Sequence, residues 1–320
     1  MDVVRPRVGV SGCLLGSPVR YNGGHSRCRF LTDELARYVS WEPVCPEMEI
    51  GLGAPRPMVR LLSDGRLAAK DGTADHSGAV AELTGRTAPS WEELDGFVFK
   101  ARSPSCGLFG VPRYSAGLPG ERTDGQPVDH RGRGAFAAAL TDARPDLPVE
   151  EEGRLNDPVL REHFVERIFA HARLRELLAG GWRAGDLVAF HSRHKLQIMA
   201  HEPEAYRESG RIVARAGTAP REETALAYRR VFTRALGVRP SRGRHVNALQ
   251  HVFSLLTARL NGPRRHDLVE TIGEFEAGRV PLSLPVALLR HHALGEELPY
   301  VVGQTYLDPY PQELGLRHRL

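Results

Sequence analysis

Short apolar stretches with β-strand character recur through residues 1–150 and alternate with segments of helical character. Three of the strand-like stretches are Val8–Val10, Trp41–Val44 and Phe97–Phe99. Alternation of strands and helices is typical of a parallel or mixed sheet covered by helices. We therefore predict an α/β, Rossmann-like fold for the N-terminal part of the chain.

Four segments of this part have a helical pattern: residues 29–39, 76–84, 134–140 and a helix that begins at Ser90. The last of these opens with Ser-Trp-Glu-Glu, which is the pattern of a capping box. Residues 55–69 predict a β-hairpin with Asp64 and Gly65 at its turn. Two polar stretches, residues 117–134 and 145–158, predict a loop and a proline-bounded connector.

From Val159 onward the pattern becomes helical, because Phe164, Ile168, Leu174 and Leu178 fall near helical spacing. Further helices are expected at residues 185–199, 203–216, 221–236, 243–261 and 266–277. The C-terminal part is therefore predicted to be mainly α-helical.

The 320 residues are enough for two domains of ordinary size. We expect an N-terminal α/β domain at residues 1–155, a connecting helix at 156–183 and a helical domain at 184–320. No apolar run approaches the ~20 residues of a membrane span. The first residues, MDVVRPRVGV, lack the apolar core of a signal peptide, so we expect the protein in the cytoplasm.

Charge is divided unevenly between the two parts of the chain. Residues 1–150 hold 18 Lys and Arg against 19 Asp and Glu, whereas residues 151–320 hold 25 against 20. Lys195 is the only lysine of the second part, so arginine supplies nearly all of its positive charge. Arginine suits contacts with the phosphates of a nucleic acid. A GC-rich genome that favours arginine codons is the alternative explanation.

Three cysteines each follow a predicted strand: Cys13, Cys45 and Cys106. Ligands of α/β proteins bind outside the carboxyl ends of the strands, so three thiols there would form a soft-metal site with one open position. The wide spacing matches no zinc or ferredoxin motif, and a buried thiol is the alternative for each cysteine alone. Gly and Pro beside the three thiols favour the metal site. Cys28, at a predicted helix start, is interpreted as a structural cysteine.

Three acid–base candidates accompany these thiols. Glu47 lies two residues after the second cysteine, where a carboxylate has a plausible role in proton transfer. Ser103 and Ser105 precede the third cysteine and offer hydroxyls to a substrate or a cluster sulfide. The alternatives are a surface carboxylate and two serines that cap loop backbone.

The segments SGCLLGSPVRYNGG, EPVCPEMEIGLGAPRPMVRL and KARSPSCGLFG resemble TudS-type thiouracil desulfidases, in order and spacing, across most of residues 6–150. The second half resembles a YbgA-like domain through LVAFHSRHKLQIMAHEPEAYRESGRIVA, RHVNALQHVFSLL, and PLSLPVALLRHH with the tail TYLDPYPQELGLR. Together the two parts resemble the fused RudS desulfidases, which are associated with removal of 4-thiouridine from transfer RNA.

The resemblance implies a 4Fe–4S cluster held by only three cysteines, here Cys13, Cys45 and Cys106. It implies that the open iron takes the sulfur of a thiocarbonyl, that water supplies oxygen, and that hydrogen sulfide leaves. It also implies that Glu47 and a serine, Ser103 in preference to Ser105, handle the protons. A soft iron centre prefers sulfur to the oxygen of uracil, which agrees with this chemistry.

Two positions depart from the family pattern. Val19 stands where relatives commonly carry a cysteine, which supports three ligands rather than four. Asn22 replaces an acidic residue of the family pattern, which leaves this position without an assigned role.

The helical part offers candidates for contact with RNA phosphates. They are Arg193, Lys195, Arg242, Arg244 and His245. Solvated helix surface is the alternative for each. His191 and His194 share a helix face, but they lack a carboxylate partner in a recognisable metal motif.

The leading hypothesis is an iron–sulfur desulfidase of thiolated uracil, acting on 4-thiouridine in transfer RNA. Its close variant acts on the free base or nucleoside. The alternative from another class is a non-catalytic RNA-binding or protein-binding module with metal-free cysteines. A cluster-dependent lyase or dehydratase of a small molecule is a third reading.

Overall fold

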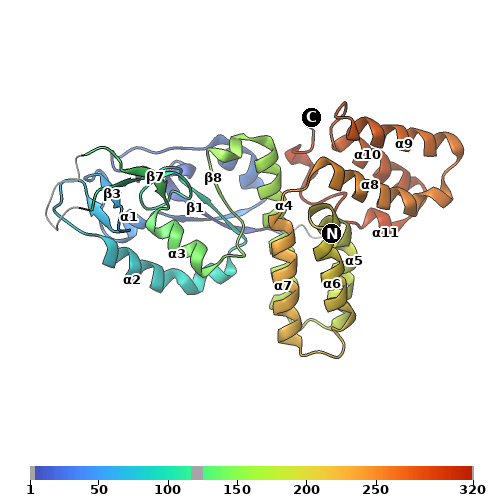
Figure 1. Cartoon of the computed structure of the whole chain (residues 1–320), viewed down its shortest axis with the longest axis horizontal. Helices are drawn as coiled ribbons and strands as arrows, with labels where there is room; N and C mark the ends of the chain where they lie inside the picture. Colours follow the sequence, from blue (N-terminus) through green and yellow to red (C-terminus); the bar gives the residue numbers. More distant parts are fainter. Residues whose placement is uncertain (1–3, 117–124, 319–320) are drawn as a thin grey trace. The chain divides into compact units, whose positions relative to one another are not determined.

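The computed structural model describes residues 4–116 and 125–318 of the chain. It divides into two compact units, Met1–Phe164 and Val165–Leu320, and the division falls within helix α4 (Pro158–Ala179). The N-terminal unit is α/β and the C-terminal unit is almost entirely helical (Figure 1). This confirms the predicted fold classes.

The main sheet of the N-terminal unit has four parallel strands. Their order is β2 (Ser40–Val44), β1 (Arg7–Ser11), β5 (Gly96–Phe99) and β8 (Val149–Glu151). Every residue of β5 is buried, which is typical of a parallel sheet covered on both faces. The three strands that precede the cysteines are therefore neighbours, so their carboxyl ends meet at one edge of the sheet.

A second, mixed sheet completes this unit. Its order is β4 (Leu67–Ala69), β3 (Val59–Leu62), β6 (Val111–Tyr114) and β7 (Asp129–Gly132). Strands β3 and β4 are antiparallel and form the predicted hairpin, with Gly65 at φ 90° in its turn. The helices are α1 (Pro46–Glu49), α2 (Ser77–Thr87) and α3 (Ala135–Ala143), of which α2 and α3 lie side by side (Figure 1).

Four local predictions for this unit need correction. Ser90 lies inside a 3₁₀ helix, Ala88–Glu93, and its hydroxyl donates to Thr87 O, so it is no N-cap. Residues 29–39 form a π-helical turn and a 3₁₀ turn instead of an α-helix. The predicted loop at 117–134 contains β7; its residues 117–124 lie outside the described part of the chain.

The fourth correction concerns the predicted connector at 145–158, which contains buried strand β8. Two glutamates made this stretch look solvent-exposed. Glu150 is instead paired with Arg154, and Glu151 accepts hydrogen bonds from two backbone N–H groups, those of Leu108 and Phe109. Partners distant in sequence thus allow charged side chains in a buried strand.

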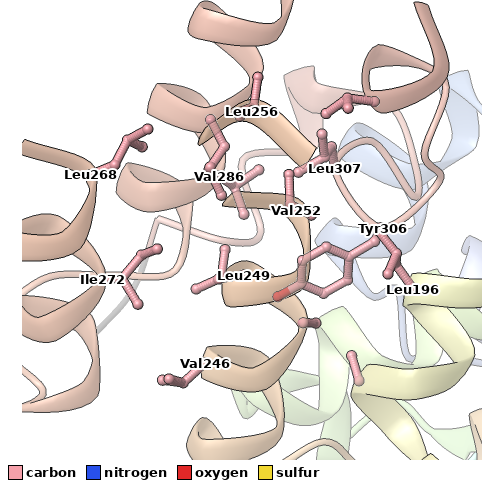
Figure 2. Packing of buried hydrophobic residues seen from close by; sticks show 14 of the residues in the cluster. Leu196, Val246, Leu249, Val252, Leu256, Leu268, Ile272, Val286, Tyr306 and Leu307 are labelled. Carbon is pink, nitrogen blue, oxygen red and sulfur yellow. The ribbon is translucent and has the colours of Figure 1, made fainter. Parts of the chain in front are cut away.

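The C-terminal unit contains the five predicted helices. They are α5 (Ala184–His201), α6 (Pro203–Ala214), α7 (Arg221–Gly237), α8 (Arg242–Leu256) and α9 (Gly262–Glu276). Two further helices that the sequence analysis did not predict follow them, α10 (Ser283–Gly295) and α11 (Pro299–Val302). Figure 2 shows that Leu249 and Val252 of α8 face Ile272, Val286 and Tyr306. Within the described residues, no helix is both long and apolar enough to cross a membrane.

Two histidines, the fully buried His194 and the partly buried His245, make the C-terminal unit sensitive to acid. Burial lowers the pKa of His194 and of His245 to about 3. The neutral ring of His194 hydrogen-bonds Phe190 O through Nδ1 at 2.8 Å, and that of His245 contacts the Tyr306 hydroxyl at 3.1 Å. Because the unfolded chain takes up these protons near pH 6.5, the stability they contribute is present above that pH and is lost as the pH falls toward 3.

We expect the free energy of unfolding to fall between pH 7 and pH 5 by about 2 kcal/mol for each of these histidines. Urea unfolding followed by helical circular dichroism at the two pH values measures this. His194→Gln should recover about 2 kcal/mol of the difference. The exposed His266, with 83% of its side chain accessible, supplies the control H266Q, which should leave the difference unchanged. Equal pH dependence in H194Q and the unmodified protein would contradict the prediction.

Candidate functional site

The three candidate cysteines line one cavity at the carboxyl edge of the main sheet. Cys13 lies in the 3₁₀ turn Gly12–Leu15 that follows β1, and Cys45 lies between β2 and α1. Cys106 lies in the loop after β5. The cavity has a volume of about 370 Å³, which is within the range of small-ligand sites. The carboxyl ends of the three strands therefore converge, as the sequence predicted.

The three thiols differ in their exposure to solvent. Cys13 and Cys106 are 7% and 6% exposed, and Cys45 is half-buried. Burial raises the pKa of the Cys13 thiol to about 11, although Lys100 and Arg20 oppose this rise. Burial also raises the pKa of the Cys45 and Cys106 thiols. The thiols are thus protonated at neutral pH in the metal-free protein, and binding of a metal would release their protons.

The loop that carries Cys106 is fixed by helix α3. Three N–H groups of the first turn of α3 donate to carbonyls of Pro104 and Ser105, at 2.9–3.2 Å. A Cβ atom on Gly134 would lie 2.6 Å from the backbone of Ser105, so only glycine allows this close approach. The backbone just before Cys106 is therefore held by helix α3.

Cys28 lies outside this constellation. Its backbone N–H donates to Leu14 O at 2.8 Å, and its half-buried thiol is not among the groups that line the cavity. This position agrees with the interpretation of Cys28 as a structural cysteine.

Glu47 extends into the cavity from α1, and only 9% of the residue is exposed. Its Oε2 accepts a hydrogen bond from Arg56 Nε at 2.8 Å, and the Arg56 Nη2 group contacts the same oxygen. Its Oε1 accepts a hydrogen bond from the Ser105 hydroxyl at 2.8 Å. Glu47 is therefore a buried, fully oriented carboxylate, in contrast to the surface carboxylate that was the alternative.

The two candidate serines occupy different environments. Ser105 is fully buried and touches Glu47. Ser103 lines the cavity, and its Oγ accepts hydrogen bonds from the backbone N–H groups of Ser105 and Cys106 at 3.3 and 3.1 Å. Ser103 thus caps the backbone of the cysteine loop through its oxygen. Its hydroxyl hydrogen remains free to be donated to another group.

Sequence reasoning did not single out several polar cavity residues, among them Ser11, Arg20, Arg56, Lys100 and Arg102. Ser11 accepts a hydrogen bond from the Lys100 N–H at 2.9 Å, and its side chain acts to lower the pKa of the Cys106 thiol against the larger effect of burial. The Lys100 side chain forms an ion pair with Glu152. A signal for Arg56 was present, since it lies between two prolines in the GLGAPRP tract.

The donor set that the cavity offers to a metal consists of cysteine thiols. Cys13, Cys45 and Cys106 line the cavity, and thiolate is the ligand type of iron–sulfur clusters. Among the described residues, no group of three or more His, Cys, Asp or Glu side chains converges to hold one metal ion.

The five candidates for RNA contact lie in the C-terminal unit and differ in accessibility. Arg193 and Arg242 are exposed. The Lys195 ammonium lies 5.2 Å from the Tyr300 ring centre. Arg244 donates to His201 O at 2.5 Å, and His245 faces the Tyr306 hydroxyl. Lys195, Arg244 and His245 thus have partners within their own unit.

Comparison with known proteins finds relatives of both units. Residues 8–152 match a family model described as 2-thiouracil desulfurase, and residues 195–311 match one described as a protein of unknown function, DUF1722. The uncharacterized protein YbgA of Escherichia coli strain K12 is 29% identical over 153 residues, which make up 48% of this chain and 90% of that protein. A solved structure of the 4Fe-4S-dependent thiouracil desulfidase TudS is 28% identical and covers 50% of this chain and 100% of its own, with a TM-score of 0.38.

Proposed function

We propose that this chain, in which a 2-thiouracil desulfurase domain is joined to a YbgA-like DUF1722 domain, removes sulfur from a thiolated uracil with the help of an iron–sulfur cluster. The observation that carries the proposal is the meeting of three thiols and one oriented carboxylate in a single cavity. Cys13, Cys45 and Cys106 would hold a 4Fe–4S cluster, which leaves one iron without a protein thiol.

When bound, the cluster supplies a soft iron with affinity for the sulfur of a thiocarbonyl. The protein's own groups supply the proton chemistry. Glu47 takes a proton from the water whose oxygen forms the new bond to carbon, and the carbon–sulfur bond breaks. The sulfur leaves as hydrogen sulfide after it has gained the protons of that water. The reaction C=S + H₂O → C=O + H₂S needs no electron donor.

The two serines have separate roles in this proposal. Ser105 hydrogen-bonds Glu47 Oε1 and thereby extends the proton path from the carboxylate. Ser103 keeps Cys106 in position through the backbone and offers its hydroxyl to a group bound in the cavity.

We infer that the substrate is 4-thiouridine in transfer RNA, with the free base or nucleoside as the second candidate. The support comes from the cations that line the cavity. Of the four cations that line the cavity, Arg56 and Lys100 are paired with carboxylates. Within the described part of the chain, Arg20 and Arg102 form no ion pair, which leaves them available to phosphate.

The C-terminal unit would contribute further phosphate contacts. Arg193 and Arg242 are the favoured candidates, because they are exposed, and Lys195 is the third. A target base inside the folded RNA would have to be extruded into the cavity. A cytoplasmic location completes the proposal, because reducing conditions keep the thiols of Cys13, Cys45 and Cys106 available to iron.

The proposal is tested on protein purified without oxygen. We expect about four irons per chain and release of hydrogen sulfide from transfer RNA that contains 4-thiouridine. Free 2-thiouracil and 4-thiouridine, assayed under the same conditions, decide between the two substrate classes. Binding of the transfer RNA should weaken at least about tenfold between 50 and 200 mM salt.

Three results would overturn the proposal in different ways. Full activity of metal-free protein would exclude the cluster. Transfer RNA binding without turnover by iron-loaded protein would favour the non-catalytic module. If only the free base is turned over, and binding of transfer RNA does not depend on salt, the substrate is the free base and not transfer RNA.

A further inference from the structure

The buried side chain of Arg56 is tied to the candidate base Glu47. Only 4% of the Arg56 side chain is exposed, and it reaches the cavity from the tract that follows α1. Its Nε and Nη2 both donate to Glu47 Oε2, and its Nη1 donates to Gly53 O at 2.6 Å. The Arg56 backbone N–H donates to Tyr21 O at 2.8 Å, which fixes the main chain as well.

The two oxygens of Glu47 are held by different partners. Arg56 occupies Oε2 through two donors, whereas Oε1 accepts a single hydrogen bond from the Ser105 hydroxyl. A carboxylate oxygen has capacity for two hydrogen bonds. Oε1 is therefore the oxygen with remaining capacity to accept a proton, and the guanidinium fork determines which oxygen that is.

Stability alone gives a weak reason for such a pair. Desolvation of two buried charges offsets most of their attraction, so apolar side chains of similar size stabilise a fold as well. The pair nevertheless lies in the cavity wall next to the cysteine loops. A planar fork also fixes the orientation of a carboxylate in a way that a lysine does not.

We propose that Arg56 is the positioning residue of the reaction: it fixes the Glu47 carboxylate so that Oε1 faces the proton to be moved. This inference rests on the proposed function. Arg56 acts through Glu47 and does not bind the substrate. Its replacement therefore lowers kcat and leaves KM nearly unchanged, whereas loss of a substrate contact would raise KM.

The test is the variant Arg56→Ala, with iron content measured beside activity. We expect kcat to fall about 100-fold and KM to change less than about threefold, as for a misplaced catalytic group. Guanidinium chloride at millimolar concentration fills the vacated space and should raise the kcat of R56A about tenfold. Arg56→Lys keeps the charge without the fork, so it should lose activity and show no rescue.

Two further measurements separate positioning from general structural damage. In a Glu47→Gln background, Arg56→Ala should cause no additional loss, because the two residues act as one unit. A crystal structure of R56A should show the hydrogen bond between Glu47 Oε1 and Ser105 Oγ broken, a readout that needs no activity.

Arg144 supplies the matched control: it is 12% exposed, is paired with Asp146 at 3.1 Å and does not line the cavity. R144A should keep kcat and gain nothing from guanidinium.

The outcomes distinguish this inference from the proposed function. An active unmodified protein together with an R56A variant of normal kcat, or of raised KM alone, overturns only the inference. Retention of the Glu47–Ser105 hydrogen bond in R56A also overturns it. An iron-loaded unmodified protein that releases no sulfide from any thiolated uracil overturns the proposed function, and the role of Arg56 falls with it.

Discussion

Replacement of Cys106 by serine is expected to remove iron from the N-terminal unit and to abolish desulfidation. Thiolate sulfur is the ligand that iron–sulfur clusters require, and a hydroxyl is a poor substitute for it. In the proposed cluster, the remaining two thiols would leave two irons without a protein ligand. Iron and sulfide analysis of C106S, purified without oxygen, should therefore give less than about a tenth of the iron in the unmodified protein, and sulfide release should be undetectable.

The choice of serine and of a control cysteine makes this result specific. Serine is nearly isosteric with cysteine, so the loop Ser103–Gly107 should keep its backbone contacts with helix α3. Cys28→Ser changes a half-buried thiol that does not line the cavity. C28S should keep both iron and activity. Iron retained in C106S and lost in C28S would reverse the ligand assignment.

Local patterns were sufficient to predict the strands that carry the thiols. The apolar runs at Val8–Val10 and Phe97–Phe99 form buried central strands, and a cysteine after such a strand lies at the carboxyl edge by geometry alone. The strand order that makes β2, β1 and β5 neighbours does not follow from those runs. It comes from packing between segments about 30 to 90 residues apart.

The burial of individual polar residues could not be predicted from the sequence. Glu151 in β8 lies in the core because backbone N–H groups of the loop after Cys106 donate to it. The contact between Ser105 and Glu47 joins residues 58 positions apart, and no local pattern distinguishes Ser105 from Ser103. Partners distant in the chain determine whether a polar side chain is exposed or buried, and periodicity does not reveal them.

In the helical unit, too, the sequence predicts the helices but not which of their polar residues are exposed. Helices α5 to α9 were expected from apolar spacing, and they are present. Arg244 and His245 sit at the start of α8, where a basic run suggested contact with RNA. The fold turns both toward partners inside the unit, His201 and Tyr306. Helical periodicity identifies the helix, but the packing of its neighbours decides which polar residues remain accessible.

Glu47→Gln is expected to lower kcat by about 10²- to 10⁴-fold while the iron content stays unchanged. The amide has the size of the carboxylate and keeps one oxygen for Arg56 Nε or for the Ser105 hydroxyl, but it does not accept a proton at neutral pH. Single-turnover assays of sulfide release from the preferred thiolated substrate, with iron measured on the same sample, separate the chemical step from assembly of the site.

Glu49, on the same short helix and exposed, supplies the matched control. E49Q changes the net charge near the cavity by the same amount without altering a group that lines it, so its kcat should remain within about twofold of the unmodified protein. Equal losses in E47Q and E49Q would mean that charge near the cavity matters and proton transfer by Glu47 does not. Loss of iron in E47Q alone would instead make Glu47 part of the cluster site, because a true base is dispensable for holding the metal.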